Sequence, residues 1–170
     1  MTSDDRIGPP SFGSEREMLR AFLDYHRATL AMKCDGLADE ELRQPSMPPS
    51  TLSLLALVRH MAEVERAWFR RVFEDNDAPM VWSDKMFDFQ AAYDASASTR
   101  HQAFAAWEAE VENSRRIERE AESLDLAGYQ PRWGESVSLR MVIMHVLLEY
   151  GRHNGHADLL REGIDGTVGA

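Results

Sequence analysis

Residues 145–161, HVLLEYGRHNGHADLLR, combine titratable side chains with the apolar pattern of a buried helix. Glu149 and His153 are four residues apart, so their side chains project side by side from one face of a helix. That face otherwise carries the apolar residues of a helix–helix seam, namely Leu139, Val142, Val146 and Leu160. A carboxylate and an imidazole in such a seam cost free energy unless a partner compensates them. A bound metal ion is one such partner, so the spacing indicates a metal site.

Simpler roles for these side chains stay open. A histidine on an apolar face is most often a core residue that one hydrogen bond satisfies. Glu149 and His153 could form a hydrogen-bonded ion pair, or Glu149 could pair with Arg140 or Arg152. His156 adds a third polar side chain to the same seam. Three polar groups on one buried face weaken these simpler explanations, and the rest of the chain has to decide between them and a metal site.

Two amphipathic helices are expected in the first half of the chain. Ser14 and Glu17 have the spacing of a capping box, which predicts that the first helix begins there, and its apolar face continues to about Cys34. A proline-rich connector follows. Apolar residues spaced three and four apart then predict a second helix over residues 51–75, capped within the pair Ser50–Thr51.

The second half of the chain predicts two more helices. One covers residues 87–124, a crossover covers residues 124–137, and the last helix begins at Ser136 or Ser138 and ends at Gly163. No stretch alternates between apolar and polar residues in the manner of a strand. Four long amphipathic helices, with long connections after the first, second and third, predict an all-α four-helix bundle.

The second helix offers a third candidate ligand. His60 lies beside Met61 at the border of the helix seam, from where its side chain can point inward. Two imidazoles and one carboxylate suit zinc, nickel or ferrous iron, and three protein ligands leave a position for water or substrate. The charged residues of this helix are expected to be solvated: Glu63, Glu65, Arg66, Arg70 and Arg71.

Composition limits the class of protein. A chain of 170 residues, 44% of them hydrophobic, fits one globular domain. We expect that domain over residues 14–166, between a flexible arm at 1–13 and a tail at 167–170. The net charge of −10 and the lack of a basic patch argue against nucleic acid as a partner. Because neither a membrane-length apolar run nor a signal-peptide core is present, a cytoplasmic protein with no membrane partner is expected. The single cysteine, Cys34, is expected to be buried structure.

Two phrases of the sequence resemble a known family. Residues 52–69, LSLLALVRHMAEVERAWF, and residues 139–166, LRMVIMHVLLEYGRHNGHADLLREGIDG, look like the corresponding helices of DinB/YfiT-like four-helix bundles. They are most similar to the branch that includes the mycothiol-dependent maleylpyruvate isomerases, and the resemblance covers nearly the whole chain. It implies a metal triad of His60, Glu149 and His153. Glutamate in the second of these places is typical of the isomerase branch, whereas many other members have histidine there.

One position departs from the family pattern. The helix ending that usually reads His-Arg-Gly-Gln is HNGH at residues 153–156. His156 could therefore be a fourth ligand that closes the site, a residue that supports a ligand, or a general base. His145, four residues before Glu149, could donate a hydrogen bond to that carboxylate or be a core residue.

The resemblance also implies an activity. In such a protein a metal ion binds a low-molecular-weight thiol such as mycothiol or bacillithiol, and the thiolate attacks a small electrophile. We therefore expect a metal-dependent thiol S-transferase or isomerase of detoxification or stress response. A non-catalytic metal-binding bundle and a metal-assisted hydrolase are the alternatives. The family further implies a homodimer, and surplus aromatic residues could form its interface or belong to the core: Trp68, Phe69, Phe73 and Trp82.

Overall fold

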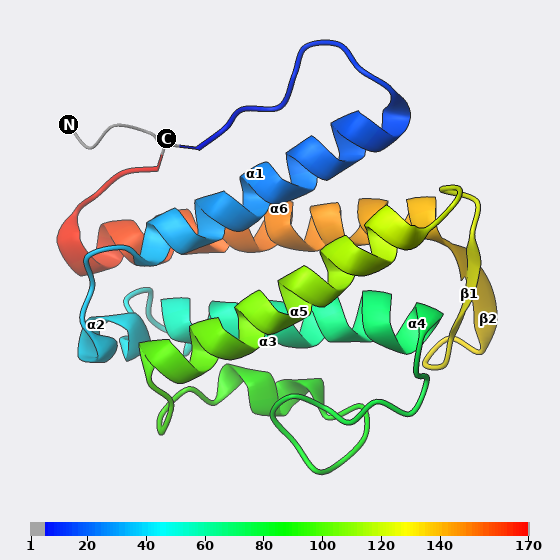
Figure 1. Cartoon of the computed structure of the whole chain (residues 1–170). Helices are drawn as coiled ribbons and strands as arrows, with labels where there is room; N and C mark the ends of the chain where they lie inside the picture. The colour runs from blue at the N-terminus through cyan, green and yellow to red at the C-terminus, as the bar shows by residue number, and fades with distance from the viewer. Residues whose placement is uncertain (1–5, 170) are drawn as a thin grey trace.

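The computed structural model describes residues 6–169, and its four long helices form the predicted all-α bundle. They are α1 (Glu15–Cys34), α3 (Leu54–Glu65), α5 (Arg100–Glu120) and α6 (Leu139–Asp165). Figure 1 shows α1 lying across α6 and α5 lying across α3, with a small β-hairpin at one end of the bundle. Because α3 also packs against α6, the two helices that carry the candidate ligands are neighbours. Within residues 6–169, no helix combines the length and the hydropathy that crossing a lipid bilayer requires.

Local signals at the ends of α1 and α6 act as predicted. Ser14 and Glu17 form the capping box of α1, in which the Ser14 side chain accepts from the backbone N–H of Glu17 and the Glu17 carboxylate accepts from that of Ser14. Ser138 caps α6, and Gly166, with φ of +78°, ends it after Asp165, two residues beyond the predicted end at Gly163. Of the predicted arm, residues 6–13 contain no helix; residues 1–5 lie outside the described part of the chain.

The second long helix begins later than predicted and changes pitch. The side chain of Ser53 accepts a hydrogen bond from the backbone of Ala56, so Ser53, and not the pair Ser50–Thr51, caps α3. After α3 the chain continues as a π-helical turn, η1 (Arg66–Arg70), and then as α4 (Arg71–Phe73). A π turn holds one residue more than an α turn, so the residues beyond it face a different direction than an unbroken α-helix would give them.

The third long helix is shorter than the predicted span of 87–124. A 3₁₀ turn, η2 (Phe89–Tyr93), precedes a break, and α5 begins only after Thr99. The break has a local cause: the carboxylate of Asp94 accepts hydrogen bonds from the backbone N–H and the hydroxyl of Ser96. Such side-chain contacts satisfy backbone groups outside a helix and so compete with helix formation. A further short helix, α2 (Asp39–Arg43), lies in the connector that follows α1.

The expectation that no strand is present was wrong. Residues of the predicted crossover form an antiparallel hairpin of β1 (Ala127–Gln130) and β2 (Glu135–Ser138). Gly128 packs directly on α4: a Cβ atom built there would lie 2.6 Å from the carbonyl oxygen of Val72. The turn between the strands includes Gly134 with φ of +73°.

The expected solvation of the charged residues after His60 was also wrong in part. All twelve residues of α3 are buried, because α1, α5, α6 and η2 surround it. Glu63 is 1% exposed and pairs with the buried Arg71, whose Nη2 lies 3.3 Å from Oε1. Glu65 is completely buried and accepts two hydrogen bonds from Arg27 of α1, at 2.9 and 2.8 Å. A helix surrounded on every side has no solvated face on which to place its charges.

Candidate metal centre

The structure brings His60, Glu149 and His153 together between α3 and α6. The Nε2 atom of His153 lies 3.4 Å from Oε2 of Glu149, and Nε2 of His60 lies 3.6 Å from the same oxygen. The two imidazole rings meet edge to face, with centroids 4.6 Å apart. One donor atom from each of the three residues lies within 4.8 Å of the others. The three side chains therefore converge on one point from two helices.

The buried state of His60 tests whether a metal ion fits this point. The side chain lies against the ring of Tyr93, stacked at 4.8 Å, and neither ring nitrogen of His60 has a hydrogen-bond partner among residues 6–169. The 3.6 Å separation from Glu149 is too long for a hydrogen bond. Buried polar atoms without a partner are uncommon. A set of two imidazole nitrogens and one carboxylate oxygen fits a divalent metal ion. Coordination of such an ion would satisfy one of the two ring nitrogens of His60.

The protonation of the triad is in keeping with metal binding. Burial lowers the pKa of His60, which favours the neutral imidazole, the form that donates a lone pair to a metal. The imidazoles of His153 and His60 hold the pKa of Glu149 well below its usual range. Glu149 is therefore a carboxylate at neutral pH, and it offers the negative charge that a cation requires.

His156 contacts a member of the triad and does not join it. Its Nδ1 lies 3.3 Å from Nδ1 of His153, whereas Nε2 of His153 is the nitrogen nearest Glu149. Which of the two Nδ1 atoms carries the proton depends on the tautomers. Of the three roles open to His156, support of a ligand is the one that this geometry favours, because the contact orients the ring of His153.

His145 links the triad to a wall of aromatic residues. Its Nε2 lies 3.7 Å from Oε1 of Glu149, and its ring packs on Trp68 with centroids 3.8 Å apart. Trp133, from the turn of the hairpin, meets the edge of the same ring. The indole of Trp68 is thus in the core. Neither Trp68 nor Tyr93 of η2 could be assigned to the site from sequence spacing, because the contacts of Trp68 with His145 and of Tyr93 with His60 join segments that are distant in sequence.

The two other histidines of the chain and its cysteine lie elsewhere. His26 of α1 contacts Asn154, whose Nδ2 lies 3.3 Å from Nδ1 of His26, so it is a packed histidine of the bundle. His101 is exposed on α5. Cys34 is completely buried, and burial raises the pKa of its thiol to about 12. A thiol in this state is inert at neutral pH, so the chain itself supplies no reactive thiolate there.

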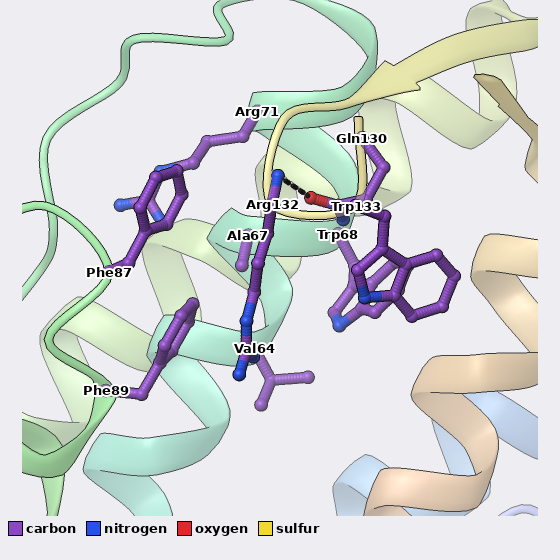
Figure 2. A pocket seen from close by; sticks show the side chains of 9 residues that line it. All are labelled: Val64, Ala67, Trp68, Arg71, Phe87, Phe89, Gln130, Arg132 and Trp133. Atoms are coloured by element: carbon purple, nitrogen blue, oxygen red, sulfur yellow. Dashed lines mark hydrogen bonds between the residues drawn. The ribbon is translucent and has the colours of Figure 1, made fainter. Parts of the chain in front are cut away.

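A small cavity lies where the end of α3 and the turn η1 meet the hairpin turn (Figure 2). It has a volume of about 30 Å³ and is bounded by the helix beyond His60, by the loop before η2 and by the hairpin turn. Val64, four residues after His60 and therefore on the same face of α3, forms one end of it. The other residues that line the cavity are Ala67, Trp68, Arg71, Phe87, Phe89, Gln130, Arg132 and Trp133.

Comparisons with known proteins agree with this architecture. A crystal structure of a conserved protein from Enterococcus faecalis is similar in fold, with a TM-score of 0.64. The alignment covers 92% of this chain and all of the other, at 14% sequence identity, and shows a shared fold alone. No curated protein matches this chain.

Sequence comparison with family models is more specific. The model described as mycothiol-S-transferase matches residues 18–166, which include every helix that carries the triad. The match confirms the DinB-like resemblance seen in the sequence, and the bundle confirms the fold that the resemblance implied. With most of its length matched, the chain belongs to the mycothiol-S-transferase family.

Proposed function

We propose that this protein is a metal-dependent thiol S-transferase of the cytoplasm, acting with mycothiol or a similar thiol in detoxification or stress response. The observation that carries the proposal is the convergence of His60, Glu149 and His153 on one point with His156 outside the set. Three protein ligands leave room for an exogenous ligand, which separates catalytic from closed structural sites. Membership of the mycothiol-S-transferase family supports a thiol as that ligand.

Each residue of the site would have its own role in the reaction. His60, Glu149 and His153 would hold a divalent ion, and His156 would orient the ring of His153. A divalent ion in this position supplies a Lewis acid that lowers the pKa of a bound thiol. The thiol proton is released to solvent, the sulfur attacks an electrophilic carbon, and the new C–S bond forms as the leaving group departs with its electron pair. The ring of Trp68, which packs on His145 at 3.8 Å, would cover the site from that side.

Metal content and activity of the untagged protein test this proposal. We expect near-stoichiometric zinc, nickel or iron by elemental analysis, and faster conjugation of mycothiol to monochlorobimane than in protein-free buffer. His153→Ala removes one of three ligands, so both the metal and the acceleration should be lost. His101→Ala is the matched control, because it removes an exposed histidine far from the triad in sequence.

Each alternative function has its own result in this experiment. Bound metal without any thiol-dependent acceleration would contradict the transferase and leave a non-catalytic metal-binding bundle. Hydrolysis of ester or amide probes without added thiol would point to the metal-assisted hydrolase. Absence of metal from the wild type, with no change in melting temperature on adding metal, would contradict every metal-dependent function.

We also propose that the protein forms a homodimer, as the family resemblance implies. The aromatic candidates for its interface are only in part available, since Trp68 and Phe69 are buried in the core. Apolar side chains exposed on α6 are better candidates: Met144, Leu148 and Leu159. Light scattering should give twice the mass of one chain for the wild type and the mass of one chain for Leu148→Glu. A monomeric wild type at all concentrations would contradict the dimer.

A further inference from the structure

A buried arginine fastens the turn η2 to α3. Arg59, the residue before His60, is 7% exposed. Its guanidinium donates hydrogen bonds to the backbone carbonyl oxygens of Ala91 and Ala92, each at 2.9 Å. Two charge-assisted hydrogen bonds from one buried side chain restrict this segment to one position against the helix. Because Ala92 is followed by Tyr93, the last residue of η2, Arg59 also fixes where Tyr93 lies.

Tyr93 covers one face of His60 and leaves its own hydroxyl unused. The two rings are stacked, with centroids 4.8 Å apart and planes 18° apart. The hydroxyl has no hydrogen-bond partner within residues 6–169, and, unlike the ring nitrogens of His60, it can be reached by solvent. Stacking needs only the ring, so the hydroxyl is a donor that the folded chain does not employ.

The triad is open to solvent on the side of Glu149. The side chain of Glu149 is 24% exposed, against 11% for His60 and 6% for His153. A ligand from solvent therefore reaches the triad at this carboxylate. The hydroxyl of Tyr93 faces the same side, because its pKa, which burial raises, is raised further by the charge of Glu149. A free donor thus stands where a ligand would enter.

We propose that Tyr93 is a catalytic residue whose hydroxyl donates a hydrogen bond to the sulfur of the thiol at the triad. Such a hydrogen bond is stronger to a thiolate than to a thiol, so it favours the nucleophilic form. The stack on His60 and the hydrogen bonds from Arg59 hold the donor in place before the thiol arrives, so binding does not have to order it. The inference rests on the proposed function, because it requires a thiol at the triad.

Binding of 2-mercaptoethanol to the cobalt-substituted protein tests the inference. The full chain is freed of metal with a chelator and loaded with Co²⁺, whose visible spectrum reports its ligands and gains a sulfur-to-cobalt charge-transfer band when a thiolate binds. We expect this band to saturate in the wild type. Tyr93→Phe should need about tenfold more thiol, because one hydrogen bond to a charged group is lost. Before thiol is added the two spectra should be the same, since the variant keeps the stacked ring and the triad.

Tyr129→Phe is the matched control. It removes the hydroxyl of a tyrosine on β1 that is 48% exposed, and no ring contact joins that residue to the triad in the part of the chain that the structure describes, so thiol affinity should stay unchanged.

The outcomes separate the inference from the proposed function. Equal thiol affinity of the wild type and Tyr93→Phe would overturn the inference and leave the proposed function in place. A different cobalt spectrum in thiol-free Tyr93→Phe would also overturn it, because the residue would then act on the metal ligands and not on the thiol. A wild type that binds no cobalt, or a cobalt protein that binds no thiol, would contradict the proposed function and the inference together.

Discussion

The carboxylate of Glu65 connects all four long helices of the bundle. It accepts two hydrogen bonds from Arg27 of α1 and a third, at 2.8 Å, from the hydroxyl of Tyr150 on α6. That hydroxyl accepts in turn from the indole N–H of Trp107 on α5, at 2.7 Å. Burial raises the pKa of Tyr150 well above its ordinary value, so the hydroxyl remains a donor. The network fixes the four helices at one level of the core.

Substitution of Glu65 by glutamine should destabilise the fold strongly. The change removes the buried counter-charge of Arg27 and leaves its guanidinium only the partly exposed Asp24, at 3.1 Å, so we expect a cost of about 3 kcal/mol of unfolding free energy. Urea denaturation followed by circular dichroism measures the difference. Glu112→Gln, which removes an exposed carboxylate paired with Arg119, should change stability by less than about 1 kcal/mol. Equal stability of the two variants would contradict a structural role for the network.

At this scale the sequence predicted the convergent residues but not their surroundings. Glu149 and His153 could be identified because their four-residue spacing places them on one apolar face, and His60 bordered the facing seam. Glu65 could not, because its burial depends on packing of α3 against three other helices and η2. The burial of Arg71 was missed for a related reason, because the π turn before it changes the face of the helix on which it lies.

The β-hairpin is the element that could not be predicted from the sequence. Each strand has only four residues, too few for a period of two to show, and their pairing depends on contact with the end of α4. Asn76, just beyond α4, donates a hydrogen bond to the carbonyl oxygen of Tyr129 on β1 at 3.1 Å. The four long helices, by contrast, could be predicted from amphipathic spacing and end signals that need no distant partner.

Two glycine substitutions should show how the hairpin is attached. Gly128→Ala places a methyl group 2.6 Å from the carbonyl oxygen of Val72, a backbone atom that cannot swing away, so we expect a loss of about 1–3 kcal/mol. Gly151→Ala adds a methyl group to an exposed position of α6 with nothing within 4 Å, and should stabilise the protein by about 0.5–1 kcal/mol. Opposite shifts of the melting temperature would confirm the contact; a neutral Gly128→Ala would contradict it.

For the whole molecule, a metal ion in the triad would join two helices that are distant in sequence. Ligands from α3 and α6 meet only in the folded chain, so binding energy adds to folding stability. With free metal about a thousandfold above Kd, this contribution is about 4 kcal/mol, which corresponds to about 10 °C in melting temperature. Chelation should therefore lower the melting temperature of the wild type by this amount and leave His153→Ala unchanged. An equal effect on both proteins would contradict binding at the triad.

The hairpin turn has a consequence for how relatives of this protein could diverge. Arg132 and Trp133 are exposed residues of the turn between two short strands, outside the packed bundle, whereas the triad lies between α3 and α6. Under the proposed function, the residues of the reacting centre are constrained by the core, whereas the turn that adjoins it through the contact of Trp133 with His145 is not. Exchange of this short turn between family members should transfer substrate preference while the reacting centre stays intact.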